Sequence, residues 1–401
     1  MAVFFLRCIC SRSPRRYLSV APLDAGGEHD VIVSGSIISD SVVSGDAKHS
    51  YLTVRSLLKS ETDPSRILDL CHSASLSPDH HLGRSALSAA VSSLAASPNH
   101  LPAVRSLLAP LVMSKRHVPH AISLFGLAGL LDDAAEAFRS SPSLFSLNAL
   151  LFACILSNNH KQAGTFFRDI PVSYAIKPNI VTYNTVIKAF CESGGSRTFY
   201  SFLDEMVHKD IKPNLTTFSI ALSGFYREEL FSDVKRVLWL MKKNGRHAGL
   251  SIYNARIQSL CKLGRPEEAK ELLREMRPRG MKPSWVTYDH LILGYCSVGN
   301  LEEAKRLFKE MGRKQLVPQS SCYFSLIYYL CRNGDFGPAL EICRESMDRN
   351  WVPQFSTMKM LVDGLVGTLQ VKEARELVEK VKGKFFRNME LWNKIEEALP
   401  K

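Results

Sequence analysis

Features typical of a membrane protein, a metalloprotein or an enzyme are missing from this 401-residue sequence. No apolar run approaches the roughly 18 residues that a membrane-spanning helix needs, so we expect no membrane span. The ten cysteines are dispersed, with no Cys-x-x-Cys pair and no histidine pair at zinc-finger spacing, so neither a zinc site nor a disulfide framework is predicted. A Walker-type phosphate loop, the deaminase motifs His-x-Glu and Pro-Cys-x-x-Cys, and clustered carboxylates are also absent. We therefore predict no catalytic residue, no bound metal and no cofactor.

Basic residues outnumber acidic ones, with 51 Lys and Arg against 39 Asp and Glu and a formal charge of +12. This balance favours a polyanionic partner, either nucleic acid or an anionic membrane surface, without choosing between them. The hydrophobic content of 45% is that of a folded protein. The chain is longer than one ordinary core requires and suits two or three domains or a repeat array.

The N-terminal 30 residues have the composition of an organellar import sequence. No acidic residue precedes Asp24, and four arginines are interspersed with apolar residues and serines, as in transit peptides. The apolar stretch is short and is interrupted by Arg7, which argues against a secretory signal. The segment RYLS at residues 16–19 resembles a mitochondrial processing site. We expect import into the mitochondrion, with the plastid as one alternative and a plain basic tail as the other.

The second half of the sequence repeats every 35 residues. Prolines recur at intervals of 35 or 70 residues: Pro178, Pro213, Pro283, Pro318 and Pro353. Aromatic residues share this phase: Tyr183, Phe218, Tyr253, Tyr288 and Tyr323. Methionines, glycines and alanines follow the same period. A shared period of this length indicates an array of helical pairs, each of which must stack on its neighbours to bury its apolar face.

Each repeat unit predicts two amphipathic helices. With Ile180 as position 1 of a unit, apolar residues fall at positions 4, 7, 8, 11 and 12, the spacing of one buried helix face. A second apolar stripe occupies positions 20, 23, 24 and 27. Glycine at position 15 suits a left-handed residue that ends the first helix, and we expect the proline at position 34 to end the second. Four position-12 cysteines are predicted to be small core residues: Cys191, Cys261, Cys296 and Cys331.

The pattern predicts an all-α fold, a right-handed α-solenoid superhelix of stacked helix-turn-helix repeats of 35 residues. The predicted units are 144–179, 180–214, 215–249, 250–284, 285–319, 320–354 and 355–389. We expect degenerate helical repeats over 31–143, about seven good repeats over 144–389 and a capping helix over 390–401.

The repeats resemble those of the pentatricopeptide repeat family. The segments VTYNTVI (181–187), LCKLGR (260–265) and EEAKRLFKEM (302–311) are similar to its consensus. The tetratricopeptide repeat, at about 34 residues, is the neighbouring alternative. That repeat requires a small residue at position 8, where this chain has bulky residues such as Ile187. Except for unit 144–179, which is one residue longer, every unit has the 35-residue length that is similar to the P-class of plant organellar members. The resemblance is strong over 144–389 and weak over 45–143.

This resemblance implies single-stranded RNA as the partner, with each repeat contacting one base on the inner face of the solenoid. In the family, positions 5 and 35 select the base and position 2 sandwiches it. Carried over, the rule names these RNA-binding residues: Asn148, Asn179, Val181, Asn184, Asn214, Ser219, Asn254, Ser284, Val286, Asp289 and Gln319. Three pairs resemble pyrimidine-selecting combinations: Asn148/Asn179, Asn184/Asn214 and Asn254/Ser284. For each asparagine, N-capping of a helix is the alternative role.

Three selective units are too few to define one site among organellar transcripts. We therefore expect sequence-tolerant RNA binding in mitochondrial RNA stability, processing or translation, on messenger or ribosomal RNA. The segments around Asn148, Phe167 and Trp392 resemble short plant members associated with the mitochondrial ribosome, so a ribosome-associated structural component is an alternative. A protein-binding scaffold, a role open to any α-solenoid, is the third possibility.

Overall fold

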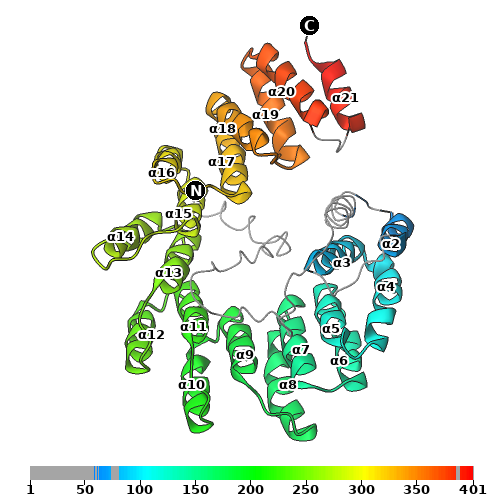
Figure 1. Cartoon of the computed structure of the whole chain (residues 1–401), viewed down its shortest axis with the longest axis vertical. Helices are drawn as coiled ribbons and strands as arrows, with labels where there is room; N and C mark the ends of the chain where they lie inside the picture. Colours follow the sequence, from blue (N-terminus) through cyan, green and yellow to red (C-terminus); the bar gives the residue numbers. More distant parts are fainter. Residues whose placement is uncertain (1–57, 59–60, 62, 74–80, 385–388, 401) are drawn as a thin grey trace, which may run out of the picture.

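The computed structural model describes residues 58, 61, 63–73, 81–384 and 389–400. The predicted import sequence, residues 1–30, lies outside these ranges. The described residues form helices joined by short loops, and no strand occurs among them. Figure 1 shows the helices following one another along an arc, from α2 at one end to α21 at the other. The prediction of an all-α solenoid is confirmed.

Each repeat unit contains a first and a second helix. The first helices are α7 (Leu144–Leu156), α9 (Ile180–Glu192), α11 (Leu215–Arg227), α13 (Leu250–Lys262), α15 (Trp285–Ser297), α17 (Ser320–Asn333) and α19 (Phe355–Gly367). The second helices are α8 (His160–Ser173), α10 (Phe199–His208), α12 (Phe231–Lys243), α14 (Pro266–Met276), α16 (Leu301–Arg313), α18 (Phe336–Asp348) and α20 (Val371–Lys384). The helices outside these units are α2 (Pro64–Ser73), α3 (His81–Leu94), α4 (Leu101–Met113), α5 (Val118–Leu127), α6 (Leu131–Ser140) and α21 (Met389–Ala398).

A residue with left-handed backbone follows each first helix at position 15. Glycine occupies the position in four units, with φ between 69° and 86°: Gly194, Gly264, Gly299 and Gly334. The other three units have Asn158, Glu229 and Leu369, with φ between 55° and 63°. Glycine has no Cβ to clash in this conformation, which explains why glycine recurs with the period.

A left-handed residue, and not the proline at position 34, ends the second helix, so that part of the prediction is wrong. The α10 helix stops at His208, Asp210 has a φ of 54°, and the Ile211 amide donates to the Met206 carbonyl oxygen over 2.8 Å. Pro213 comes later, in the extended link before α11, where it disfavours helical backbone in the residue before it. No recurring residue marks this left-handed position in the sequence, because position 31 holds Asp, Gly, Gln or Asn in different units.

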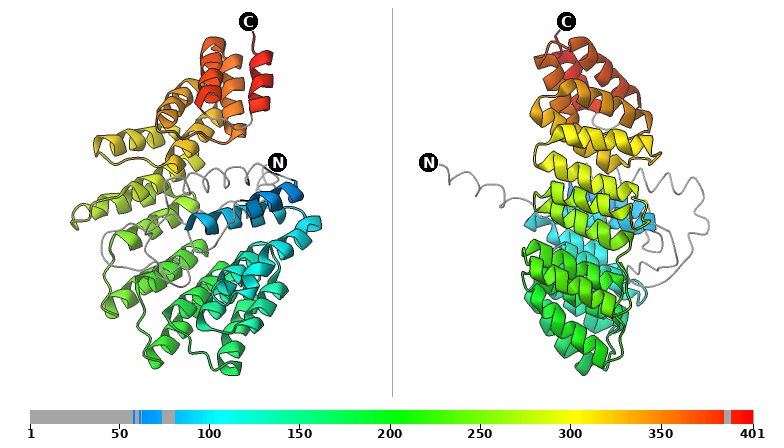
Figure 2. Two further views of the ribbon diagram at one scale, coloured as in Figure 1. Left: turned by 45° about the vertical axis from the view of Figure 1, so that its right-hand side comes forward. Right: turned by 90° about the vertical axis from the view of Figure 1, so that its left-hand side faces the viewer.

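From α7 to α17, successive first helices make the most extensive backbone contacts between units, and they line the inner side of the arc (Figure 1). Figure 2 shows the same stack of helical pairs from two other sides. Small residues at position 10 permit this approach. A Cβ on Gly294 would stand 2.5 Å from the Cys261 Sγ, and one on Gly224 would stand 2.7 Å from the Cys191 Sγ. Both cysteines are buried packing residues, as predicted, whereas Tyr329 is a bulky exception at position 10.

A polar cluster joins the two helices within most units. In unit 285–319, the Tyr288 hydroxyl donates to Glu310 over 2.8 Å, and the Lys314 ammonium lies 2.9 Å from the same carboxylate. Three other units repeat the cluster: Tyr183/Glu205/Lys209, Tyr253/Glu275/Arg279 and Tyr323/Glu345/Arg349. Unit 215–249 replaces all three residues with Phe218, Leu240 and Asn244. A buried tyrosine hydroxyl needs a hydrogen-bond partner, and unit 215–249, which lacks the hydroxyl, also lacks the glutamate.

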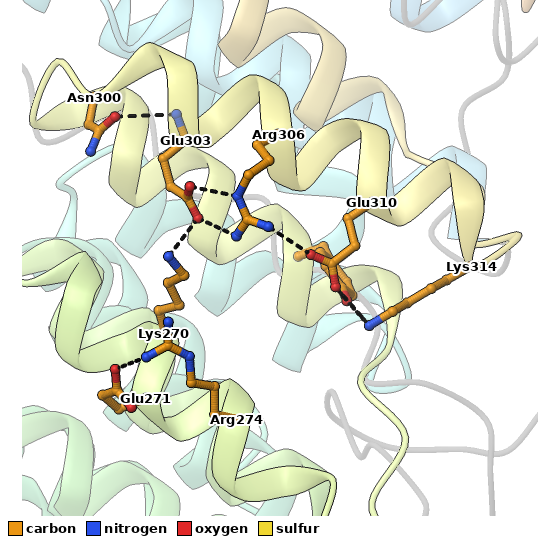
Figure 3. Close-up of polar contacts among 9 residues, drawn as sticks. Lys270, Glu271, Arg274, Asn300, Glu303, Arg306, Glu310 and Lys314 are labelled. Carbon is orange, nitrogen blue, oxygen red and sulfur yellow. Dashed lines mark hydrogen bonds and ion pairs between the residues drawn. The ribbon is translucent and has the colours of Figure 1, made fainter.

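Ion pairs connect the second helices of neighbouring units on the outer side of the arc (Figure 3). Lys270 of α14 lies 2.9 Å from Glu303 of α16, and Arg306 contacts the same carboxylate at 2.6 Å. The hydrogen bond from Arg306 is the main reason that the pKa of Glu303 falls to about 2. Part of the acidic content of the chain is therefore neutralised within the outer row of helices.

Candidate nucleic-acid interface

The three predicted position-5 asparagines are each held by a threonine of the following unit. The Thr217 hydroxyl donates to the Asn184 Oδ1 over 2.7 Å. Bonds of the same length join Thr182 to Asn148 and Thr287 to Asn254. Because each side-chain oxygen is engaged, the amide nitrogen Nδ2 is the group left to contact a ligand. In Asn184 this nitrogen also lies 3.4 Å from the Asn214 Oδ1, a long hydrogen bond.

The position-35 residues are helix N-caps, so the alternative role of the asparagines holds at this position. The Asn179 Oδ1 accepts the Thr182 amide over 3.1 Å, and the Asn214 Oδ1 accepts the Thr217 amide over 3.0 Å. Ser284 occupies the same place before α15. The position-3 threonine thus bonds both to the N-cap of its own helix and to the position-5 asparagine of the preceding unit.

Ser219, at position 5 of α11, faces a unit that lacks this threonine. That unit begins with Gly249 as the N-cap of α13 and has Ile252 at position 3. Neither side chain can donate or accept a hydrogen bond. The threonine network is therefore interrupted here, between the Asn184 pair on one side and the Asn254 pair on the other.

Asp289 and Gln319 belong to a different arrangement, at the step from α15 to α17. The Ser321 hydroxyl donates to an Asp289 carboxylate oxygen over 3.2 Å. Burial raises the pKa of Asp289 to about 6, and the bond from Ser321 only partly opposes this effect. Gln319 is the N-cap of α17 but makes no capping hydrogen bond with its side chain. At neutral pH this step of the inner surface therefore carries a carboxylate.

Val181 and Val286 lie half-buried in the first turns of α9 and α15, as expected for the apolar position 2. Phe145 holds the same position in α7, where it is 52% exposed. Phe145 is not among the predicted RNA-binding residues, although it shares the position of Val181 within its unit. An exposed aromatic ring at this position offers a larger apolar contact than valine.

A basic row on the inner helices was also not predicted. Lys188, Arg227 and Lys262 come from α9, α11 and α13. Burial, together with the positive charges of Arg227 and Lys188, lowers the pKa of Lys262, so these cations lie close enough to repel one another. Glu192 offsets part of the repulsion and lies 3.9 Å from Lys188. Helical spacing could have predicted this row. Positions 9 and 13, which hold these cations, follow position 5 at four-residue intervals and so lie on the same helix face.

The part of the chain that the structure describes holds no group of three or more His, Cys, Asp or Glu residues able to bind a metal ion. Over the same residues, every helix is too short or too polar to cross a lipid bilayer. Burial raises the pKa of the packing cysteines, for example that of Cys191 to about 11, which keeps these thiols protonated and weakly reactive.

Comparison with known proteins gives matches over most of the chain. The model of the PPR repeat family matches residues 178–227, 249–297 and 284–332, and that of the pentatricopeptide repeat domain matches 140–194. Pentatricopeptide repeat-containing protein At1g11630, mitochondrial, of Arabidopsis thaliana is 47% identical over 379 residues, which cover 92% of this chain and 93% of that protein. The chain belongs to the pentatricopeptide repeat family.

Two further matches to this pentatricopeptide repeat protein are more local or more distant. Small ribosomal subunit protein mS78 of Arabidopsis thaliana is 39% identical over 94 residues, which cover 22% of this chain and 24% of that protein. The crystal structure of the pentatricopeptide repeat protein PPR10 from maize has 18% sequence identity and a TM-score of 0.39, covering 87% of this chain and 55% of that chain. Neither of the two matching family models describes a catalytic domain.

Proposed function

We propose that this pentatricopeptide repeat protein binds single-stranded RNA along its inner surface and catalyses no reaction. The observation that carries the proposal is the repeated placement of Asn148, Asn184 and Asn254, each with Oδ1 held by a threonine. The basic row supplies cations beside these asparagines, and their mutual repulsion would be relieved by phosphates. A chain of phosphates alternating with unpaired bases fits both features.

The chemistry of the asparagines bears on base choice. With the oxygen engaged, the Nδ2 group donates to an acceptor on the base edge. Uracil and cytosine both carry an O2 carbonyl that can accept this hydrogen bond. The amide donor therefore binds either pyrimidine and does not distinguish uracil from cytosine. This agrees with the family resemblance, in which such asparagines accompany pyrimidines. Selection at three units supports sequence-tolerant binding rather than recognition of one transcript.

The mitochondrion is the compartment that we propose. The arginine-rich, acid-free N-terminal sequence supports it, and so does similarity over 92% of the chain to a relative named mitochondrial. The proposed organisation is an import sequence at 1–30, degenerate repeats at 31–143, repeats at 144–389 and a capping helix at 390–401. Import of labelled full-length protein into isolated mitochondria, followed by N-terminal sequencing, tests this proposal. Uptake by isolated plastids alone would contradict it.

A ribosome-associated structural role is the second candidate. It is favoured by one observation, the local similarity to small ribosomal subunit proteins mS78 and mS79 of Arabidopsis thaliana. Both candidates use the same inner surface and differ in the RNA that it holds. A ribosomal component meets ribosomal RNA at a fixed place, so weak base selection would suffice.

Ultraviolet crosslinking of the tagged full-length protein in mitochondria, with sequencing of the attached RNA, separates the candidates. We expect crosslinks in pyrimidine-rich single-stranded segments of messenger RNA. Crosslinks confined to ribosomal RNA, together with co-sedimentation with ribosomes, would favour the second candidate. Recovery of RNA at the level of an untagged control would contradict both and leave the protein-binding scaffold.

A further inference from the structure

The inner surface changes character at α17, where an aromatic and cationic stripe replaces the asparagines. We propose that α17 is a stacking platform for unpaired nucleobases, which it holds without regard to base identity. The proposal deepens the RNA-binding function proposed above and rests on it. It assigns the C-terminal part of the inner surface to RNA contact of a second chemical type.

The stripe follows from the register of the repeat. Phe324, Tyr328 and Arg332 are spaced four residues apart and so lie on one face of α17. In α9 the first two of these positions hold Asn184 and Lys188. Tyr328 is 37% exposed and Arg332 is exposed. Because α17 belongs to the inner row of helices (Figure 1), this open side of the helix contributes to the inner surface.

Neighbouring side chains restrain the Tyr328 ring. The Arg332 guanidinium lies 5.8 Å from the ring centroid, a cation–π distance. The Tyr329 ring makes a T-shaped contact with it, at 5.2 Å between centroids and an interplanar angle of 83°. Tyr329 is the residue that breaks the rule of a small side chain at position 10, so the chain holds a second ring here in place of the usual close packing. A ring already restrained loses little side-chain entropy when a base stacks on it.

The same chemistry explains why RNA is the occupant and why base identity does not matter. Every base has a π face, so stacking on tyrosine is tolerant of sequence. Phe324 stands where four other units have Asn or Ser, and it offers no hydrogen bond to a base edge. Arg332 supplies a cation for the phosphate beside a stacked base. The stripe also continues, in register, the helix face that carries the basic row.

The test compares variants of the full-length protein in titrations with homopolymeric single-stranded RNAs of equal length, oligo(U) and oligo(A). Tyr328→Ala is expected to weaken binding of both RNAs by about 5- to 100-fold, because one stacked base is lost. Tyr328→Phe keeps the ring and should bind as the unchanged protein does. Trp239→Ala is the matched control, because Trp239 is 58% exposed beside Lys243 on α12, in the outer row, and should not contact RNA. Crosslinking with 5-iodouridine RNA is expected to mark the Tyr328 peptide of the unchanged protein and not the Trp239 peptide.

The outcomes separate this platform from the proposed function. If Tyr328→Ala binds both RNAs as the unchanged protein does, while Asn184→Ala with Asn254→Ala weakens oligo(U), the platform is wrong and the function stands. A loss limited to one of the two RNAs would also overturn the platform, since stacking is indifferent to the base. Absence of binding by the unchanged protein would overturn both. The crosslink needs no variant, so its result does not depend on whether Tyr328→Ala folds.

Discussion

Units 144–284 and unit 320–354 turn the same helix face toward the inner surface but place different chemistry on it. In the first region, Asn184 and Asn254 present amides whose oxygens are held by the next unit, beside the basic row. In the second, Phe324 and Tyr328 present rings. One backbone register can therefore support base selection at one end of the molecule and base-tolerant stacking at the other. The selective positions therefore lie within units 144–284, where the unit of Ser219 interrupts them.

The largest expected effect is on the first region. Asn184→Ala combined with Asn254→Ala removes two donors to bases and should weaken binding to a pyrimidine oligonucleotide by about 1–3 kcal/mol per base. Fluorescence anisotropy titrations against oligo(U) and oligo(A) measure the change. Ser219→Ala is the comparison at a position 5 outside the threonine network, and it should cost less than either asparagine because its hydroxyl is not oriented by the next unit. Equal losses on both RNAs would mean that these asparagines do not select bases.

The next effect concerns the close approach of inner helices on which both regions depend. Gly294→Leu forces a side chain against the Cys261 Sγ and should lower the free energy of unfolding by about 1–3 kcal/mol. Gly312→Ala is the matched control, because a Cβ there meets nothing within 4 Å, and helix propensity predicts a small gain in stability. Urea unfolding followed by circular dichroism compares the two. If both variants unfold at the midpoint of the unchanged protein, the helices are not packed as closely as described.

Thr217→Val probes the link between units. It removes the hydroxyl that donates to Asn184 and accepts the Asn214 amide, and should lower the free energy of unfolding by about 1–2 kcal/mol. Pyrimidine affinity should fall with it, because the Asn184 amide loses its fixed orientation. Thr165→Val, at a half-buried position of the outer helix α8, is the control for the loss of a threonine hydroxyl. A loss of stability with unchanged pyrimidine affinity would separate the threonine from base selection.

The last effect marks the boundary between the regions, and it vanishes at low pH. The pKa of Asp289 is raised from 3.8 to about 6 in the folded protein, so the folded protein binds this proton more tightly than the unfolded chain does. The resulting stability is fully present below pH 4 and is lost as the pH rises through about 6. Asp289→Asn should therefore stabilise the protein by about 1–3 kcal/mol at pH 8, since the shift is about two units at about 1.4 kcal/mol each, and leave it nearly unchanged near pH 3. Thermal unfolding at the two pH values measures this, and a difference independent of pH would show that Asp289 ionises normally.

Much of the fold could be predicted from the sequence, because the two apolar stripes, the position-15 glycine and the aromatic at position 4 all express contacts within one helical pair. The end of the second helix was assigned to Pro213 instead of the left-handed Asp210. Different residue types adopt the left-handed backbone at position 31 in different units, so no recurring residue marks it in the sequence. The candidate site was predicted only as a set of positions. The basic row and Tyr328 could not be predicted from the family's base-contacting positions, because they lie at positions 9 and 13, which that rule does not include.

The period, the helical pairs and the positions that face the inner surface were determined by the sequence alone, because 35-residue periodicity and amphipathic spacing are properties of the chain read locally. Only the tertiary structure decided how those positions behave. The Asn184 Oδ1 accepts a hydrogen bond from the hydroxyl of Thr217, which lies 33 residues further on. Lys262 lies close enough to Lys188 and Arg227, which belong to two earlier units, for their charges to lower its pKa. The physical reason is that these interactions arise where one unit stacks on the next, and the curvature of that stack brings together side chains that no local pattern connects.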